Sequence, residues 1–329
     1  MKALLSRLPG GPDTLVLEEI PEPLPEAGQV RIAVRACGVN YPDLLIIQDL
    51  YQIKPTRPFA PGAEVAGVVD ALGDGVSNVA VGERVLLAPV RSGMAQKAVG
   101  LASSCWQIPD SMPFEEAAAL LMTYGTSQHA LKDRAQLRPG ETLLVSGATG
   151  NFGSATVALA LAMGARCVVA PGRNTAVLDD LRRRFGQRVV PVRLSGDGAA
   201  DTDTMKRAAA GPIDAVQDFL PPSVGAGVAR AAIMTLRQGG RAVLMGGVGM
   251  LGGEDLALPY PWIMRNLITV RGQWMYDTAA IPGLVSLVRS GLLDLGHWAT
   301  TAFPLTGAND AVAHAAANAG PFKLTVLQP

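Results

Sequence analysis

The sequence predicts an α/β protein in which a β-rich part is followed by a doubly wound parallel sheet. Three observations support this prediction. Short apolar runs separated by Gly and Pro fill the chain before Pro113, apolar runs alternate with helical stretches after Glu141, and a glycine-rich turn joins the first of these runs to the first helix. With 329 residues the chain is long enough for about two domains with cores of their own.

The composition argues against several classes of protein. The 28 Lys and Arg residues balance 28 Asp and Glu residues, and 49% of the residues are hydrophobic. We therefore expect neither a disordered chain nor one that binds nucleic acid or an anionic membrane through its net charge. Pro9-Gly10-Gly11-Pro12 interrupts the N-terminal apolar run, and the other apolar stretches are shorter than a membrane span requires. The sequence predicts a cytoplasmic protein that acts on a small molecule.

The β-rich part shows the alternation expected of half-buried strands. Val30–Ala36 alternates apolar and polar residues, and Val65–Leu72 and Arg84–Ala88 are short apolar runs between turn residues. Phe114–Leu121 predicts a helix, because two glutamates stand in its first turn, where the helix dipole favours negative charge.

The chain after Glu141 has the alternation of a parallel sheet with crossover helices. The predicted strands are Thr142–Val145, Cys167–Ala170, Val189–Val192, Ala215–Gln217, Ala242–Met245 and Ile268–Val270. The predicted helices are Ser154–Met163, Ala176–Phe185, Thr202–Ala210 and Val228–Leu236. This is the number of strands in a full dinucleotide-binding fold.

The tail departs from this alternation. It contains two helix candidates, Ile281–Ser290 and Ala311–Ala319, and ends in a predicted strand at Phe322–Leu327. Because the sheet of the β-rich part needs a partner, we expect the tail to return to it.

A glycine-rich turn predicts the cofactor site. Gly147 permits a tight turn from strand to helix, Gly150 lets backbone N–H groups approach a pyrophosphate, and Gly153 lets the helix pack closely on the sheet. Thr149, Asn151 and Phe152 complete the turn, and the helix N-terminus attracts the diphosphate. The alternative is an ordinary glycine-rich turn.

The end of the second predicted strand bears on the choice of nicotinamide cofactor. An acid at this position would bond the ribose hydroxyls of NAD, but the chain reads Gly172-Arg173-Asn174. With no carboxylate there, Arg173 and Asn174 predict NADPH, whose 2′-phosphate Arg173 can grip bidentately. The alternative is a solvated surface arginine. Gly246 and Gly247 end the fifth strand, where either a cofactor or an ordinary turn would need them.

Two further segments, together with the glycine turn, resemble the medium-chain dehydrogenase/reductase superfamily, and most closely its zinc-free NADPH:quinone oxidoreductase branch. They are Ala36-Cys37-Gly38-Val39-Asn40-Tyr41-Pro42-Asp43 and Pro58-Phe59-Ala60-Pro61-Gly62-Ala63-Glu64-Val65-Ala66-Gly67. The resemblance implies a GroES-like catalytic domain formed by residues 1–118 and 275–329, with a Rossmann domain at 119–274. It also implies NADPH-dependent reduction in a cleft and a homodimer, for which the sixth strand offers an edge.

The same comparison argues against a metal. Zinc alcohol dehydrogenases of this superfamily carry a Cys, a Gly-His-Glu and a second Cys around the catalytic ion, whereas here Ala63 takes the histidine position. Cys37 and Glu64 cannot complete a site that needs three protein ligands. The three cysteines, Cys37, Cys105 and Cys167, are also too few for a four-cysteine lobe. We therefore expect no metal and a buried Cys37.

The resemblance also suggests the substrate residues. Asn40 and Tyr51 correspond to quinone-reductase positions and could donate hydrogen bonds to a carbonyl oxygen, and Thr123 corresponds to a residue beside the nicotinamide. Their ordinary alternatives are a turn-forming Asn, a half-buried loop Tyr and a helical Thr that bonds its own backbone. For Tyr260-Pro261-Trp262 and Gln273-Trp274-Met275-Tyr276 we expect ordinary packing, and the alternative is that they line the cleft or a subunit interface.

The predicted function is transfer of a hydride from NADPH to a quinone or a similar conjugated carbonyl compound. A quinone accepts hydride without a Lewis acid, whereas an unactivated ketone would need zinc or a strong proton donor. The alternatives are an enone or enoyl-thioester reductase, a zinc alcohol dehydrogenase, and an NADPH-binding protein without turnover.

Overall fold

The computed structural model describes residues 1–90, 92–118, 120–248, 253–318 and 320–329. Its contacts divide the chain into two compact units. Unit 1 comprises Met1–Met122, Leu295–Ala319 and Lys323–Pro329, and unit 2 comprises Thr123–Asp294 and Gly320–Phe322. The two units divide after Met122 and after Asp294, further along the chain than the domain boundaries predicted at 118/119 and 274/275. Those domain boundaries remain a prediction.

Unit 1 is built on a seven-stranded sheet in the order β14-β15-β3-β4-β5-β7, with β6 paired to β3. Its other sheet pairs β1 with β2. The strands are β1 (Lys2–Ser6), β2 (Leu15–Glu19), β3 (Gln29–Gly38), β4 (Val65–Leu72), β5 (Arg84–Leu87), β6 (Lys97–Leu101), β7 (Cys105–Gln107), β14 (Ala299–Pro304) and β15 (Lys323–Gln328). The α-helices are α1 (Tyr41–Ile47), α2 (Phe114–Ala117) and α10 (Ala308–Ala317), and short 3-10 turns are η1 (Pro12–Thr14), η2 (Ala102–Ser104) and η8 (Leu305–Gly307).

The end of the chain returns to unit 1 from Leu295 onward, whereas the first helix of the tail, Ile281–Arg289, lies in unit 2. Strand β15 pairs antiparallel with β3, where Val326 lies opposite Gly38, and β14 pairs parallel with β15. The core of unit 1 accordingly joins residues from both ends of the chain, such as Ile32 on β3 with Val312 on α10 and Leu327 on β15.

Unit 2 contains a six-stranded parallel sheet in the order β10-β9-β8-β11-β12-β13. Numbered along the chain, this is the order 3-2-1-4-5-6 of the dinucleotide-binding fold, which confirms the predicted doubly wound sheet. The strands are β8 (Thr142–Ser146), β9 (Cys167–Gly172), β10 (Val189–Arg193), β11 (Ile213–Asp218), β12 (Leu236–Leu244) and β13 (Thr269–Gly272).

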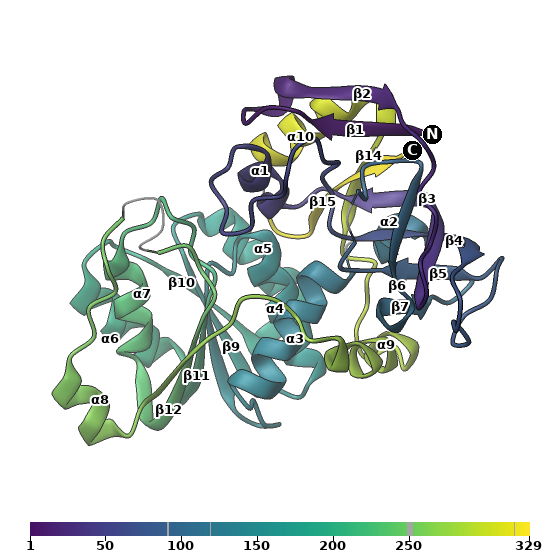
Figure 1. The fold of residues 1–329 in the computed structure, drawn as a ribbon. Coiled ribbons are helices and arrows are strands. Elements are labelled where there is room, and N and C mark those ends of the chain that lie inside the picture. Colours follow the sequence, from purple (N-terminus) through teal and green to yellow (C-terminus); the bar gives the residue numbers. More distant parts are fainter. Residues whose placement is uncertain (91, 119, 249–252, 319) are drawn as a thin grey trace. The chain divides into compact units, whose positions relative to one another are not determined.

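Helices cover both faces of this sheet (Figure 1). One face carries α6, α7 and α8, whose apolar residues pack with Leu144 and Val216 of the sheet, and the other carries α3, α4 and α5. The helical segments are η3 (Leu120–Gly125), α3 (Thr126–His129), η4 (Ala130–Arg134), α4 (Asn151–Ala162), α5 (Thr175–Phe185), η5 (Gly186–Arg188), α6 (Gly198–Ala208), α7 (Ala226–Ile233), α8 (Tyr260–Asn266), η7 (Thr278–Ala280) and α9 (Ile281–Arg289). No helix among the described residues has both the length and the apolar character needed to cross a bilayer.

Two local features differ from the sequence-based expectation. The helix predicted to run to Leu236 ends at Ile233, because Leu236 already pairs with Ile213 and begins β12. Gly239, with a φ of +71°, lies in the irregular stretch that follows this first pair. The helix expected over Phe114–Leu121 is also interrupted, since α2 ends at Ala117 and a π-helical turn starts at Leu120.

Candidate active site

The glycine turn has the geometry that its sequence predicts. It joins β8 to α4, Gly147 adopts a φ of +80°, and its carbonyl accepts the Gly150 N–H at 2.9 Å. A Cβ on Gly153 would collide with the backbone of Gly147 and would lie 2.7 Å from the Cα of Ala148. Gly153 is therefore required for the close approach of the helix to the turn, whereas a Cβ on Gly150 would meet only the Gly147 oxygen, at 3.4 Å.

The turn leaves polar groups available for a ligand. The Ser154 N–H donates to the Gly150 carbonyl at 3.0 Å and begins the hydrogen bonding of α4. The N–H groups of the helical residues before Ser154 therefore have no acceptor within their own helix. The buried Oδ1 of Asn151 has no hydrogen-bond partner among the described residues. Phe152 and Phe219 flank the turn with ring centroids 6.0 Å apart. A diphosphate fits the N–H groups at the start of α4, because this helix N-terminus also carries a partial positive charge.

Gly246 and Gly247 follow β12 and lie against the segment after β11. A Cβ on Gly246 would approach Leu220 O to 2.6 Å, and the Gly247 N–H donates to the same oxygen at 2.7 Å. Burial raises the pKa of nearby Asp218 to about 7, and its Oδ1 has no partner among the residues described. These glycines therefore keep the carboxyl end of β12 close to that of β11.

An exposed arginine, and not an acid, follows β9, and a second exposed arginine ends the neighbouring β10. Arg173 follows Gly172 directly, and parallel pairing brings Arg193, at the end of β10, opposite Gly172. Neither guanidinium forms a hydrogen bond or ion pair with any residue that the structure describes. Asn174 caps α5 by accepting the Val177 N–H at 3.3 Å. Sequence reasoning missed Arg193, because only the pairing of β10 with β9 shows its proximity.

In unit 1, Asn40 belongs to a buried network of carboxyl groups. Its side-chain Nδ2 donates to Glu64 Oε1 at 3.0 Å, and its backbone N–H donates to Asp43 Oδ2 at 2.8 Å. The other oxygen of Asp43 accepts the Gly62 N–H, and that of Glu64 accepts the Met122 N–H. Asn40 is thus the N-cap residue of α1, and its side-chain amide is held by Glu64.

Burial controls the ionisation of this network. It raises the pKa of Glu64 to about 8 and that of Asp43 to about 6, although the hydrogen bonds that each carboxyl accepts oppose the shift. Tyr51 lies half-buried in the loop that follows α1, in the same unit.

Thr123 lies in a nearly continuous helical run that starts with the π-helical turn η3. Its side chain is 1% exposed, and its Oγ1 has no hydrogen-bond partner within the described part of the chain. Its carbonyl accepts the Ser127 hydroxyl at 2.7 Å. The alternative in which the Thr123 hydroxyl bonds its own helix is therefore not what the structure shows. π-helical turns often occur at functional sites, and this buried hydroxyl keeps its hydrogen-bonding capacity unused among the described residues.

Cys37 is buried, as predicted. Burial raises the pKa of its thiol well above the usual range, and the thiol donates to the Gly38 carbonyl at 3.6 Å. Ideal Cβ atoms on Gly62 and Gly93 would lie 2.7 and 3.0 Å from its sulfur. No group of three or more His, Cys, Asp or Glu side chains is placed to hold a metal ion among the described residues.

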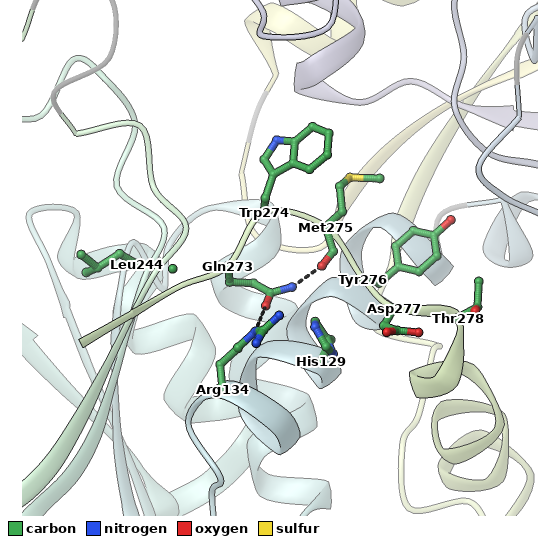
Figure 2. Close-up of a pocket in the computed structure, with 10 residues that line it drawn as sticks. His129, Arg134, Leu244, Gln273, Trp274, Met275, Tyr276, Asp277 and Thr278 are labelled. Carbon is green, nitrogen blue, oxygen red and sulfur yellow. Dashed lines mark hydrogen bonds between the residues drawn. The ribbon is translucent and has the colours of Figure 1, made fainter. Parts of the chain in front are cut away.

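A cavity of about 740 Å³ opens in unit 2 beside the ends of β12 and β13. Figure 2 shows the segment after β13 passing over His129 and Arg134 of the helical run, with Gln273 turned toward Arg134 and Trp274 turned away from it. Arg134 Nε donates to Gln273 Oε1 at 3.1 Å, and Gln273 in turn donates to the Met275 carbonyl. Trp274 is 51% exposed, and the segment Gln273-Trp274-Met275-Tyr276 lines this cavity rather than packing in a core.

Comparison with known proteins places this fold in a family. Residues 26–129 match the alcohol dehydrogenase GroES-like domain. The chain is 34% identical over 260 residues to quinone oxidoreductase-like protein 2 of Bos taurus, which covers 78% of this chain and 71% of that protein. It is 38% identical over 165 residues to quinone oxidoreductase of Rattus norvegicus, covering 50% of each.

A solved structure extends the likeness to the whole chain. A probable oxidoreductase from Mycobacterium abscessus superposes with a TM-score of 0.79 at 28% identity, over 100% of this chain and 99% of that one. The GroES-like domain and the doubly wound sheet are thereby both confirmed. The chain belongs to the medium-chain dehydrogenase/reductase superfamily of oxidoreductases.

Proposed function

We propose that this protein transfers a hydride from NADPH to a quinone or a similar conjugated carbonyl compound, without a metal. The observation that carries the proposal is the β8–α4 turn, whose glycines and N–H groups suit a dinucleotide, together with Arg173 after β9, which is exposed and has no partner among the described residues. The likeness to quinone oxidoreductase and to a quinone oxidoreductase-like protein supports the choice of acceptor.

The proposed roles follow from the placement of each residue. Gly147, Thr149, Gly150, Asn151, Phe152 and Gly153 hold the diphosphate and the adjoining ribose, Arg173 and Asn174 face the 2′-phosphate, and Gly246 and Gly247 shape the cofactor edge of the sheet. NADPH, when bound, supplies the hydride. Asn40 and Tyr51 orient the acceptor by donating to its carbonyl oxygen, and the buried hydroxyl of Thr123 bonds the nicotinamide side of the site.

A panel of electron acceptors tests this function. NADPH oxidation is followed with quinones, enones and enoyl thioesters, with NADH as the second reductant. Turnover of quinones at the highest kcat/KM supports the proposal. Turnover of enoyl thioesters alone would assign a C=C reductase, and tight NADPH binding with no oxidation would assign a binding protein.

We expect activity to survive removal of metals. Ala63 offers no ligand. Burial raises the pKa of the Cys37 thiol, and because a cysteine must lose its proton to bind zinc, this disfavours zinc binding. Protein treated with a chelator, and shown by elemental analysis to hold no zinc, should keep its full rate with quinones. Recovery of a lost rate on adding zinc would contradict the zinc-free assignment.

The second expectation concerns Tyr51. Tyr51→Phe removes one hydroxyl donor, so kcat/KM for the quinone should fall by roughly fivefold, which corresponds to a net hydrogen bond of about 1 kcal/mol. The Kd for NADPH should stay unchanged, since the turn and the arginines that are proposed to bind NADPH lie in unit 2. An altered Kd with unchanged turnover would show that Tyr51 has been assigned to the wrong ligand.

A further inference from the structure

The carboxyl group of Glu64 has no part in the proposed reaction, yet it contacts a residue that does. Glu64 is 2% exposed, and each of its oxygens accepts one hydrogen bond. Oε1 accepts from Asn40 Nδ2 at 3.0 Å, and Oε2 accepts from the Met122 backbone N–H at 2.9 Å. Met122 directly precedes Thr123 in the chain, so one carboxyl group joins two segments that carry proposed site residues.

Asn40 forms a capping box with Asp43 at the start of α1, and its side-chain nitrogen donates to Glu64. Asp43 fixes the backbone of Asn40 on both sides, because its Oδ2 accepts the Asn40 N–H and its own N–H donates to the Asn40 carbonyl at 3.0 Å. An amide can present either its oxygen or its nitrogen to a neighbour. Since Glu64 Oε1 accepts, it selects the nitrogen. The close approach of Glu64 depends on Gly38, where a Cβ would lie 2.9 Å from Oε1.

We propose that Glu64 is a positioning residue for the reductase reaction, which holds the amide of Asn40 so that the second Nδ2 hydrogen can donate to the carbonyl oxygen of the substrate. This inference rests on the proposed function, because it requires Asn40 to contact the acceptor. Without Glu64 the amide can turn over, and its oxygen would then repel the substrate oxygen.

The ionisation of Glu64 makes the arrangement sensitive to pH. Burial raises the pKa of Glu64 to about 8, and the titratable groups that act on it are Asp43 on α1 and the buried Cys37 thiol on β3. Above this pKa the carboxylate forms a charge-assisted bond to Asn40, which is stronger than the bond to the protonated acid. The grip on the amide should therefore tighten as the pH rises through about 8.

Glu64→Gln removes one of the two acceptors without changing the shape of the side chain. When the oxygen of the introduced amide accepts the Met122 N–H, its NH₂ group faces Asn40. Asn40 must then turn its side-chain oxygen toward position 64 to accept from this NH₂ group. We expect kcat for quinone to fall by about tenfold or more, because a single aligned donor contributes at least this factor. The Kd for NADPH should not change.

An exchanged pair separates positioning from packing. In the double variant Glu64→Gln with Asn40→Asp, the amide introduced at position 64 donates to the carboxylate introduced at position 40 and still accepts from Met122, so both hydrogen bonds of the pair are kept, as they are in Glu64→Gln. We expect a Tm near that of the wild type in both variants while kcat stays low, since neither presents an N–H of residue 40 to the substrate. A Tm that falls in step with kcat in Glu64→Gln would show a purely structural role, and either that result or an unchanged kcat in Glu64→Gln would overturn the inference.

The orientation of the Asn40 amide can also be measured on the full chain without substrate, even if no acceptor is turned over. The ¹⁵N-labelled side-chain amide of Asn40 should show one strongly shifted proton that titrates near pH 8 in the wild type and not in Glu64→Gln. If the shift of the Asn40 amide proton does not change with pH in either protein, the inference is overturned. Absent turnover with the titration intact would instead remove the proposed function and leave the orientation of Asn40 by Glu64 established.

Discussion

Replacing Arg173 by Ala is expected to erase most of the preference for NADPH over NADH. The wild type should favour NADPH by about ten- to a hundredfold in kcat/KM, because a hydrogen bond to a charged group contributes roughly 1.5–3 kcal/mol. Arg173 is exposed and unpaired among the described residues, so its guanidinium is available to the 2′-phosphate. The variant should lose affinity for NADPH and leave NADH nearly unchanged.

The structure supplies a matched control for this variant. Arg183 lies on α5, is also largely exposed at 75%, and pairs with Asp180, so Arg183→Ala should leave both cofactors unaffected. Raised salt should reproduce part of the Arg173 effect, since it screens an exposed charge pair. Arg193→Ala tests whether the second arginine also contacts the 2′-phosphate. If it does, this variant should lower the affinity for NADPH to a similar extent. An equal loss for NADH and NADPH in Arg173→Ala would mean that Arg173 supports the fold.

Gly150→Ala and Gly153→Ala should separate cofactor binding from folding. At Gly153 a Cβ would collide with the backbone of Gly147, so the helix must shift, and we expect the free energy of unfolding to fall by about 1–3 kcal/mol. At Gly150 a Cβ would meet the protein only at 3.4 Å. Its methyl group would instead face the proposed diphosphate, so the Tm should change little while the Kd for NADPH rises by about tenfold or more.

Thermal unfolding and NADPH fluorescence titration measure these two effects on the same samples. Gly227→Ala is the control, because a Cβ there meets nothing within 4 Å, it lies inside α7, and Ala is the better helix former. A loss of stability in Gly150→Ala as large as that in Gly153→Ala would contradict the assignment of Gly150 to the ligand.

The sequence by itself predicted the features that depend on neighbouring residues. The spacing of Gly147, Gly150 and Gly153 between an apolar strand and a helix is a local pattern, and so is the alternation that gave the six strands of unit 2. Such patterns can be read directly because strand, turn and helix preferences act over a few residues. The assignments of Asn40, Tyr51 and Thr123 came from family resemblance and remain predictions.

Tertiary structure decided the features that depend on distant residues. Strand β14 is exposed over most of its length and lacks alternation, so only its pairing with β15 makes it a strand. Arg193 comes near Arg173 only through the pairing of β10 with β9, and Glu64 meets Asn40 and Met122 across 24 and 58 residues. Contacts over such separations leave no periodic signal in a single sequence, because their partners are chosen by the packing of the whole sheet. The sequence therefore determined the fold class and the cofactor turn, whereas the packed unit determined which buried carboxyl group holds Asn40.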